Sequence, residues 1–455
     1  MGDGNTETMD QRRYDPPLAV RRLWWHLNDV ATTYLVGGSV RDILLGVRPH
    51  DYDLATSLTP AEVRERCESA GYRVLPTGER FGTVTVLTET EAVEVTTFRV
   101  EGRYNSKRQP EVSFTRNLED DLGRRDFTIN AMAMSYDEQL VDPFGGEVDL
   151  KAHVLRGVGD PAERFQEDSL RIWRLYRFAA TLNGSWAMDI YTRKAAIRYR
   201  FLTAKLSPER VRAELTKIVH GQNAEELYLL YLDGLLSIAI PEFAAGIDFD
   251  QKNHHHSRTV AEHNVLTARL LPPGKIRLAG LLHDIAKPVT YCLGDDGEYH
   301  YYGHDEVGAI MVDNTLRRLT FSNDWIDYVT TMVRRHMFPF WDAGPAAYRR
   351  LVADVGEEMA KDLLTLHVAD LRAGHMNNID WEPPARYLET IEGASKAIGE
   401  IGQKLALNGN DVMSLLEIKP GPRVGEILNA CQEAVFEDPT HNTEEWLTKL
   451  VLDWK

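Results

Sequence analysis

The hydrophobic pattern of the chain changes in character at Pro161. Before this point, short runs rich in Val, Thr and Phe are separated by Gly and Asp turns, and the segment 92–100 alternates as a half-buried strand does. A short helix is predicted at 40–47. After Pro161, apolar residues recur near every 3.6 positions, as in 164–182, which predicts helices to the end of the chain. The sequence therefore predicts an α+β head with a mixed sheet and helices, followed by an all-α remainder.

The length of 455 residues suggests about three domains at roughly 150 residues each. Within the helical part, Ser207 is a predicted N-cap and Pro208 occupies the first helical position. Gly/Pro-containing breaks near 240–250 and 383–384 separate groups of helices. We therefore divide the chain into a disordered arm at 1–20, the head at 21–158, a helical neck at 159–245, a helical body at 246–385 and a helical tail at 386–455.

The composition limits the classes of protein that the chain can belong to. A net charge of −17 counts against nonspecific binding of nucleic acid by the whole surface, although it leaves room for a local basic groove. No run of 18 apolar residues is present, and the polar start lacks the apolar core of a signal peptide. Cys67, Cys292 and Cys431 form no paired framework. We expect a cytoplasmic protein with no membrane contact, and nothing in the sequence points to an obligate protein partner.

A Gly-Gly turn followed closely by an Asp-x-Asp pair is the first candidate site. If Asp51 and Asp53 lie on one strand, their side chains point to the same side. Two such carboxylates repel each other, and binding Mg²⁺, a hard cation that prefers oxygen ligands, relieves the repulsion. The glycines let backbone N–H groups approach phosphate oxygens, and Arg41 adds a permanent cation. On its own, an Asp-x-Asp pair is equally typical of a capped turn.

Four segments in sequence order resemble the class II polymerase-β-like nucleotidyltransferases, the family of tRNA CCA-adding enzymes and bacterial poly(A) polymerases. The first is GGSVRDILLG at 37–46 with DYDLATS at 51–57. RRDFTINAMA at 124–133 resembles the ribose-recognition motif of the family, and EDSLRIWRLYRFA at 167–179 its base-recognition motif. SPERVRAELTK at 207–217 resembles the helical motif that supports the neck. The resemblance covers residues 34–219.

The resemblance implies two-metal nucleotidyl transfer that adds CCA to the 3′ end of tRNA from CTP and ATP. It implies Mg²⁺ at Asp51 and Asp53, with Glu94 as our candidate for a third carboxylate, although a solvent-facing Glu explains that residue equally well. The implied nucleotide-binding residues are Gly37, Gly38, Ser39 and Arg41 at the triphosphate, Arg125 at phosphate, Asp126 and Asn130 at the sugar, Glu167, Asp168 and Arg171 at the base, and Arg210 from the neck motif.

The chemistry of base recognition can also be argued from the residues. Asp168 and Arg171 are three positions apart, so on a helix they share a face. Together they offer an acceptor and a fork of donors, which can mimic the pairing edge of a template base. Cytosine and adenine both present an amino donor beside a ring acceptor. Guanine and uracil present the reverse and would leave buried groups unpaired, at about 1–3 kcal/mol each. A surface ion pair is the simpler alternative.

Two alternatives concern the product. Poly(A) polymerases of this family carry a Gly-Arg-Arg/Lys-Phe signature after the aspartates, and residues 77–83 resemble the CCA-adding pattern instead. The segment 101–110 resembles the flexible loop required for adding the terminal A, with Glu101 and Gln109 departing from the usual residues. Addition of A alone stays an open alternative.

Local basicity marks the neck as the candidate tRNA surface. Lys and Arg side chains there are interleaved with Tyr and Phe, which suits phosphate contacts and base stacking. A solvated helix face explains the same pattern. The residues are Arg193, Lys194, Arg198, Arg200, Lys205, Arg210 and Arg212, with Tyr191, Tyr199 and Phe201.

A second set of residues resembles the HD metal-dependent phosphohydrolase superfamily. Its core ligands would be His263, His283, Asp284 and Asp370, and His304 and His336 would complete a second metal site or bind phosphate. Imidazole and carboxylate ligands suit Mn²⁺, Fe²⁺ or Ni²⁺. The resemblance implies hydrolysis of 2′,3′-cyclic phosphates or phosphomonoesters, and a helical body that only supports tRNA is the alternative.

Two further segments were assigned no catalytic role. His254, His255 and His256 lie outside the HD motif, and we interpret them as a polar loop. The tail, with Asn408–Asp411 and the run that follows, resembles the tRNA-gripping end of bacterial class II enzymes.

Overall fold

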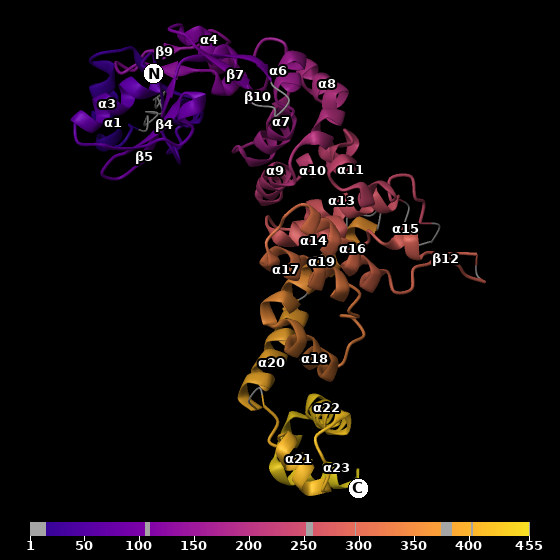
Figure 1. The fold of residues 1–455 in the computed structure, drawn as a ribbon. Coiled ribbons are helices and arrows are strands. Elements are labelled where there is room, and N and C mark those ends of the chain that lie inside the picture. Colours follow the sequence, from indigo (N-terminus) through magenta and orange to yellow (C-terminus); the bar gives the residue numbers. More distant parts are fainter. Residues whose placement is uncertain are drawn as a thin grey trace, which may run out of the picture. The chain divides into compact units, whose positions relative to one another are not determined.

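The computed structural model describes residues 15–104, 110–251, 258–295, 297–374, 385–401 and 404–454 (Figure 1). The chain forms two compact units, one of Met1–Glu226 with Asp233–Ile238 and the other of Leu227–Leu232 with Ala239–Lys455. Within the described part, no helix combines the length and the apolar character that crossing a membrane requires.

A seven-stranded sheet organises the head, in the order β3-β4-β5-β2-β1-β8-β9. β2 and β5 are parallel, and the other neighbouring strands of this sheet are antiparallel, so the predicted mixed sheet is confirmed. Its strands are β1 Thr33–Val36, β2 Asp53–Thr56, β3 Arg73–Leu75, β4 Thr83–Leu87, β5 Ala92–Thr97, β8 Ala133–Met134 and β9 Leu140–Val141.

Helices and a separate hairpin complete the head. Val36, Ala55, Phe98 and Leu122 pack into one buried cluster behind the sheet. Helix α1 overlaps the last three residues of the predicted arm because one face of the helix, including Val20, Leu23 and Trp24, is buried. The elements are α1 Leu18–Asn28, α2 Gly38–Leu44, α3 Pro60–Ser69, β6 Arg99–Tyr104, β7 Pro110–Phe114, α4 Leu118–Gly123 and α5 Gly146–Lys151, with short 3₁₀ turns at Glu79–Phe81 and Thr128–Asn130.

The helical neck differs from its prediction at the short strand β11 Ala187–Met188 and at the base-recognition motif. The pattern at 164–182 predicts one helix, but α6 ends at Glu167 and α7 begins at Leu170. Asp168 is extended, with φ −138° and ψ 104°, and its carboxylate accepts the Leu170 N–H at 3.0 Å, so it starts the second helix instead of continuing the first. The last strand of the head, β10 Val154–Leu155, pairs with β11 of the neck. The neck contains α6 Pro161–Glu167, α7 Leu170–Thr181, β11 Ala187–Met188, α8 Ile190–Tyr199, a 3₁₀ segment Arg200–Lys205, α9 Pro208–His220, α10 Glu225–Leu232, α11 Leu235–Ala239 and α12 Pro241–Ala244.

A buried acidic group in the neck gives a prediction for stability. Burial raises the pKa of Glu226 to about 7, against opposition from Arg193. The unfolded chain loses this proton near the ordinary pKa of 4.5, so the folded state binds more protons between pH 4.5 and 7 and stability falls over that range. We expect Glu226→Gln to raise the free energy of unfolding by up to about 3 kcal/mol at pH 8, with little effect at pH 4.5.

Urea denaturation at the two pH values measures this effect. Glu225→Gln, at the exposed neighbouring position, is the matched control and should behave like the wild type at both. A gain from Glu226→Gln that is the same at pH 4.5 and pH 8 contradicts the prediction.

The second unit is mainly helical, but the prediction of helix to the end of the chain was wrong between α15 and α16. There, Cys292 pairs with His300 and Leu293 with Tyr299 in a two-stranded hairpin, because strand-forming residues flank a Gly-Asp-rich turn. The elements are α13 Val260–Leu270, α14 Lys275–Leu282, α15 Lys287–Thr290, β12 Cys292–Leu293, β13 Tyr299–His300, α16 His304–Arg318, α17 Asn323–Arg335, α18 Pro345–Val355, α19 Glu357–Gly374, α20 Ala385–Ile401, α21 Gly409–Leu416, α22 Pro422–Glu437, a 3₁₀ turn Pro439–His441 and α23 Glu444–Leu452.

Candidate active sites

The glycine turn after β1 has a conformation that requires glycine. Gly37 has φ +75°, and a Cβ at this position would lie 2.6 Å from Arg125 Nη1. The turn therefore keeps a guanidinium close to the backbone that opens α2. Ser39 is buried, and its hydroxyl donates to the Val36 carbonyl at 2.9 Å. A role for the Ser39 side chain at the triphosphate stays a prediction.

Three predicted carboxylates lie around the start of β2. The strand begins at Asp53, so Asp51 lies just before it and not on it as the alternation predicts. Asp53 is in register with Glu94 on parallel β5 and with Val36, which precedes the glycine turn. The pKa of Asp53 is raised to about 6, mainly by burial and also by the negative charges of Asp51 and Glu94. Strand pairing thus places an all-oxygen donor set beside the turn, which fits Mg²⁺.

The two members of the predicted sugar site are held by arginines from other elements. Asn130 accepts a hydrogen bond from Arg41 Nη1 at 2.8 Å and donates to Asp126 at 3.1 Å. Asp126 is buried and forms an ion pair with Arg174 of α7 at 2.6 Å. Although burial raises the pKa of Asp126, Arg174 and Asn130 hold it below the ordinary value. The sequence reasoning missed Arg174, which lies in the predicted base-recognition motif.

A buried aspartate that the sequence reasoning also missed orients the arginines of the ribose motif. Asp121 is fully buried and pairs with Arg124 Nη2 at 2.7 Å and with Arg125 Nη2 at 3.4 Å. It also accepts the backbone N–H of Arg99 at 3.3 Å. Against the effect of burial, these arginines hold the pKa of Asp121 below its ordinary value. The carboxylate therefore fixes Arg125 beside Gly37. An acidic residue three and four positions before the two residues of an Arg-Arg pair was the available signal.

A cleft of about 660 Å³ connects the head with the neck inside the first unit. Glu94 lies on its wall together with residues of the 77–83 segment. The opposite wall includes Glu167, Asp168 and Arg210. The cleft thus joins a carboxylate of the predicted metal site to the predicted base-recognition residues.

Arg171 and Arg210 both lie near the base-recognition motif, but they pair with different carboxylates. Arg171 donates to Glu167 Oε2 at 2.7 Å. Arg210 donates from Nη2 to Asp168 Oδ2 at 2.7 Å. Asp168 and Arg171 do not share one helix face, because the helix is interrupted at Asp168.

The predicted tRNA surface of the neck is mixed in character. Tyr191 and Phe201 are 73% and 59% exposed, as stacking residues require. Arg193 instead forms a bidentate pair with buried Asp233, at 2.8 and 2.9 Å, and so supports the neck internally. Tyr176 donates to the same carboxylate at 2.6 Å. The contact with tRNA stays a prediction.

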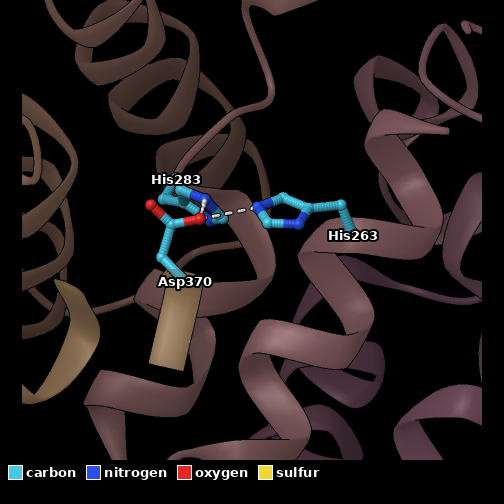
Figure 2. A group of neighbouring side chains, drawn as sticks. All are labelled: His263, His283 and Asp370. Carbon is cyan, nitrogen blue, oxygen red and sulfur yellow. Dashed lines mark hydrogen bonds and ion pairs between the residues drawn. The ribbon is translucent and has the colours of Figure 1, made fainter. Parts of the chain in front are cut away.

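Five helices of the second unit, α13, α14, α16, α17 and α19, bring the predicted HD residues together. Figure 2 shows His263 of α13, His283 at the end of α14 and Asp370 of α19 pointing toward one another. His263 Nε2 lies 2.7 Å from Asp370 Oδ1, and His283 Nε2 lies 3.6 Å from the same oxygen. The ligand atoms of the three residues all lie within 4.8 Å of one another, which is the arrangement of a metal centre.

A second group of three adjoins the first. The ligand atoms of Asp284, His304 and His336 also lie within 4.8 Å of one another. Asp284 reaches both groups, with Oδ1 3.3 Å from His304 Nε2 and Oδ2 3.3 Å from His283 Nε2. The HD residues predicted from the sequence therefore converge.

Backbone contacts orient three of the imidazoles. The Nδ1 atoms of His283, His304 and His336 lie 2.9, 2.7 and 2.6 Å from backbone carbonyl oxygens. Because a carbonyl only accepts, each Nδ1 carries a proton, so Nε2 is the atom through which each imidazole would bind a metal in its neutral form. The buried Nε2 of His283 has no hydrogen-bond partner among the described residues. These imidazole and carboxylate donors fit a divalent transition metal.

Lys287, which the sequence reasoning missed, neutralises the centre. Its Nζ lies 2.6 Å from Asp284 Oδ2 and donates to Gln251 at 3.1 Å. Burial by itself would raise the pKa of Asp284. The positive charges of His283 and Lys287 outweigh that effect and hold the pKa well below its usual range. The spacing of three residues along the chain from Asp284 to Lys287 was the signal that could have identified this lysine.

Two predictions fall outside the described residues. The polar loop at His254, His255 and His256 is one of them. Of the flexible loop at 101–110, residues 105–109 lie outside the described part.

Three family models match the chain. Residues 33–156 match the poly A polymerase head domain. Residues 187–247 match a probable RNA and SrmB-binding site of polymerase A, and residues 307–451 match domain 2 of a tRNA nucleotidyltransferase.

Relatives align with nearly the full chain. An A-adding tRNA nucleotidyltransferase of Deinococcus radiodurans is 35% identical over 88% of this chain and 90% of the relative. A CCA-adding enzyme of Latilactobacillus sakei is 34% identical, with 91% and 92% covered. Among solved structures, the Bacillus stearothermophilus CCA-adding enzyme in complex with CTP is similar, with a TM-score of 0.69, 27% identity, and 97% of this chain and 98% of that chain covered.

Proposed function

The chain belongs to the class II CCA-adding tRNA nucleotidyltransferase family, and on that premise we propose that it adds CCA to the 3′ end of tRNA from CTP and ATP. The observation that carries the proposal is the register of Asp53 with Glu94 beside the glycine turn, together with a cleft that Glu94 and residues of the base-recognition motif line. The CCA-adding relative and the structure with CTP support the same reaction.

The carboxylates Asp51, Asp53 and Glu94 would hold Mg²⁺. When bound, such ions favour deprotonation of an attacking hydroxyl and offset the charge that develops on pyrophosphate. Arg125, fixed by Asp121 beside Gly37, is placed to contact the triphosphate. Arg41 is held by Asp42 and Asn130, so its guanidinium is oriented before the nucleotide arrives. The protein thus contributes prepositioned charge around the transferred phosphate.

Addition of the terminal A alone is the alternative that a specific observation favours. The Deinococcus radiodurans relative, which is named as A-adding, shares 35% identity over 90% of its length. The two reactions differ in the tRNA end that is accepted. An enzyme limited to the last step extends only tRNA that already ends in CC.

An extension assay with purified protein and Mg²⁺ distinguishes addition of CCA from addition of the terminal A alone. The substrates are tRNA transcripts lacking CCA, ending in C, or ending in CC, each with labelled CTP or ATP. We expect two C and one A to be added to the shortest tRNA, with no further extension. Use of ATP only, on tRNA ending in CC, supports the A-adding alternative. Long A tails on unrelated RNA contradict both.

The geometry of the second unit supports a second activity, metal-dependent hydrolysis of phosphate esters. The supporting observation is the pair of adjoining three-residue groups joined by Asp284. Asp284 is neutralised by Lys287, so the carboxylate can remain ionised while buried. A transition metal bound there would supply an activated water. Substrates of the implied class are 2′,3′-cyclic phosphates and phosphomonoesters.

A further inference from the structure

The six side chains of the HD centre differ in how far solvent reaches them. The side chain of Asp370 is 25% exposed, whereas those of the other five residues are at most 7% exposed. A phosphate ester therefore approaches the ligand atoms from the side of Asp370. This carboxylate belongs to α19, so the side chain one turn away on the same face of that helix borders the approach.

His367 occupies this neighbouring position. It precedes Asp370 by three residues on α19, a spacing that places the two Cβ atoms about 5–6 Å apart. The side chain is half-buried, and its Nε2 has no hydrogen-bond partner among the described residues. An unpaired polar atom of this kind costs about 1–3 kcal/mol, which a polar group of a ligand would recover once the imidazole turns toward it.

Aromatic rings continue from His367 into the segment that follows the ligand His336. The ring centroid of His367 lies 5.0 Å from that of Trp341 and 5.4 Å from that of Phe340. Phe340 is fully buried, and Tyr348 donates to its backbone carbonyl at 2.7 Å, so this segment is anchored. Trp341 is half-buried. An anchored aromatic surface thus begins one helical turn from a ligand of the metal centre.

We propose that Trp341 and His367 form a base-binding subsite of the HD centre, an inference that rests on the proposed hydrolysis. With the phosphate of a nucleotide at the ligand atoms, the ribose spans the turn of α19 and the base stacks on Trp341. His367 donates to, or accepts from, a polar group of the sugar or base. Because every base has a π-face, the subsite favours nucleoside phosphates over phosphate esters without a base and tolerates different bases.

Hydrolysis of two phosphomonoesters, 3′-AMP and glycerol 2-phosphate, tests the subsite in the full chain loaded with Mn²⁺. We expect Trp341→Leu to lower kcat/KM for 3′-AMP about tenfold, mainly through KM, because the stacking surface is lost. His367→Asn should lower it by about threefold or more through a lost hydrogen bond. For glycerol 2-phosphate, both variants should stay within about twofold of the wild type, because this ester carries no base.

The matched controls lie in the first unit. Trp25→Leu on α1 and His220→Asn on α9 replace exposed residues and should hydrolyse both esters at the wild-type rate. Trp341→Tyr keeps a ring and should retain most of the preference for 3′-AMP. Thermal melts and metal content show whether a variant is folded and loaded. Equal losses on both esters in Trp341→Leu, or an unchanged kcat/KM for 3′-AMP in both variants, would overturn the inference.

Equilibrium binding separates the subsite from the proposed hydrolysis. Binding of 3′-AMP and of glycerol 2-phosphate is measured by calorimetry, and the part that Asp370→Asn abolishes is assigned to the HD centre. That part should be about tenfold weaker for 3′-AMP in Trp341→Leu and unchanged for glycerol 2-phosphate. A wild-type protein that hydrolyses neither ester refutes the hydrolysis, whereas equal affinities of this centre for the two esters refute the subsite.

Discussion

Replacing Asp53 by asparagine is expected to reduce the addition of C and A by about 10³-fold or more, equivalent to about 4 kcal/mol of transition-state stabilisation. Asp53 is the carboxylate nearest the centre of the cluster, because β-strand pairing sets it beside Glu94 and it interacts with the charge of Asp51. An amide at this position keeps the shape but removes the negative ligand. Single-turnover extension of tRNA lacking its end measures the loss.

The same substitution should stabilise the metal-free protein. The pKa of Asp53 is raised from 3.8 to about 6, so the unfolded chain loses the proton first as pH rises. Stability is therefore lost between pH 3.8 and 6, and the cost persists at higher pH. Asp53→Asn removes that cost and should add up to about 3 kcal/mol to the free energy of unfolding at pH 8 without Mg²⁺.

Asp29→Asn, at an exposed position of the head that pairs with Arg66, serves as the control for loss of one surface charge. It should transfer nucleotides at the wild-type rate. Retained transfer in Asp53→Asn would contradict the assignment of the metal site. A large loss of stability in Asp53→Asn would contradict the electrostatic account.

Replacing Asp370 by asparagine should reduce hydrolysis of 2′,3′-cyclic AMP and p-nitrophenyl phosphate by about 10²-fold or more and remove bound metal. Asp370 supplies the negative charge to the first ligand group and lies 2.7 Å from His263 Nε2. Burial by itself would raise the pKa of Asp370, but His263 and His283 hold this pKa well below its ordinary value. Metal content after incubation with Mn²⁺ or Ni²⁺ is measured by mass spectrometry.

Because Asp370→Asn also removes a buried ion-pair partner, a second variant guards against misfolding. His336→Gln alters the other ligand group and should likewise reduce hydrolysis. Asp313→Asn, on the exposed face of α16, is the control and should keep full activity. Wild-type rates in both Asp370→Asn and His336→Gln would show that this centre does not hydrolyse the two substrates.

The two substitutions together test whether the active sites are independent. Asp53→Asn should spare hydrolysis and Asp370→Asn should spare nucleotide transfer, since the residues lie in different compact units. Loss of both activities in either variant would show that the sites depend on each other.

Local patterns predicted some of the elements of the head. Alternation at 92–100 predicted one strand, which β5 Ala92–Thr97 confirms in part, because residues 99 and 100 belong to β6 of a separate sheet. Ser207 and Pro208 marked the start of α9. The prediction failed at Asp168, where the apolar period continues through the segment although the side chain caps a new helix. Periodicity records which face is buried, and it does not record a competing side-chain hydrogen bond.

For a similar reason, some residues of the candidate sites were predicted from the sequence and others were missed. Residues within a motif, such as the HD pair His283 and Asp284, can be recognised from their spacing in the sequence. Arg174, Asp121 and Lys287 were missed because each acts through a charge partner that only packing defines. Glu94 was one of several candidate carboxylates until its register with Asp53 was known.

The sequence by itself determined the kinds of chemistry available, namely oxygen donors beside a glycine turn and imidazoles with carboxylates on later helices. It also determined the change from strands to helices, since both depend on short-range spacing. Tertiary structure alone decided that Glu94 lies beside Asp53 and that Arg210 pairs with Asp168. Such pairings join residues up to 42 positions apart in the chain, and they are set by strand register and helix packing, which no local pattern encodes.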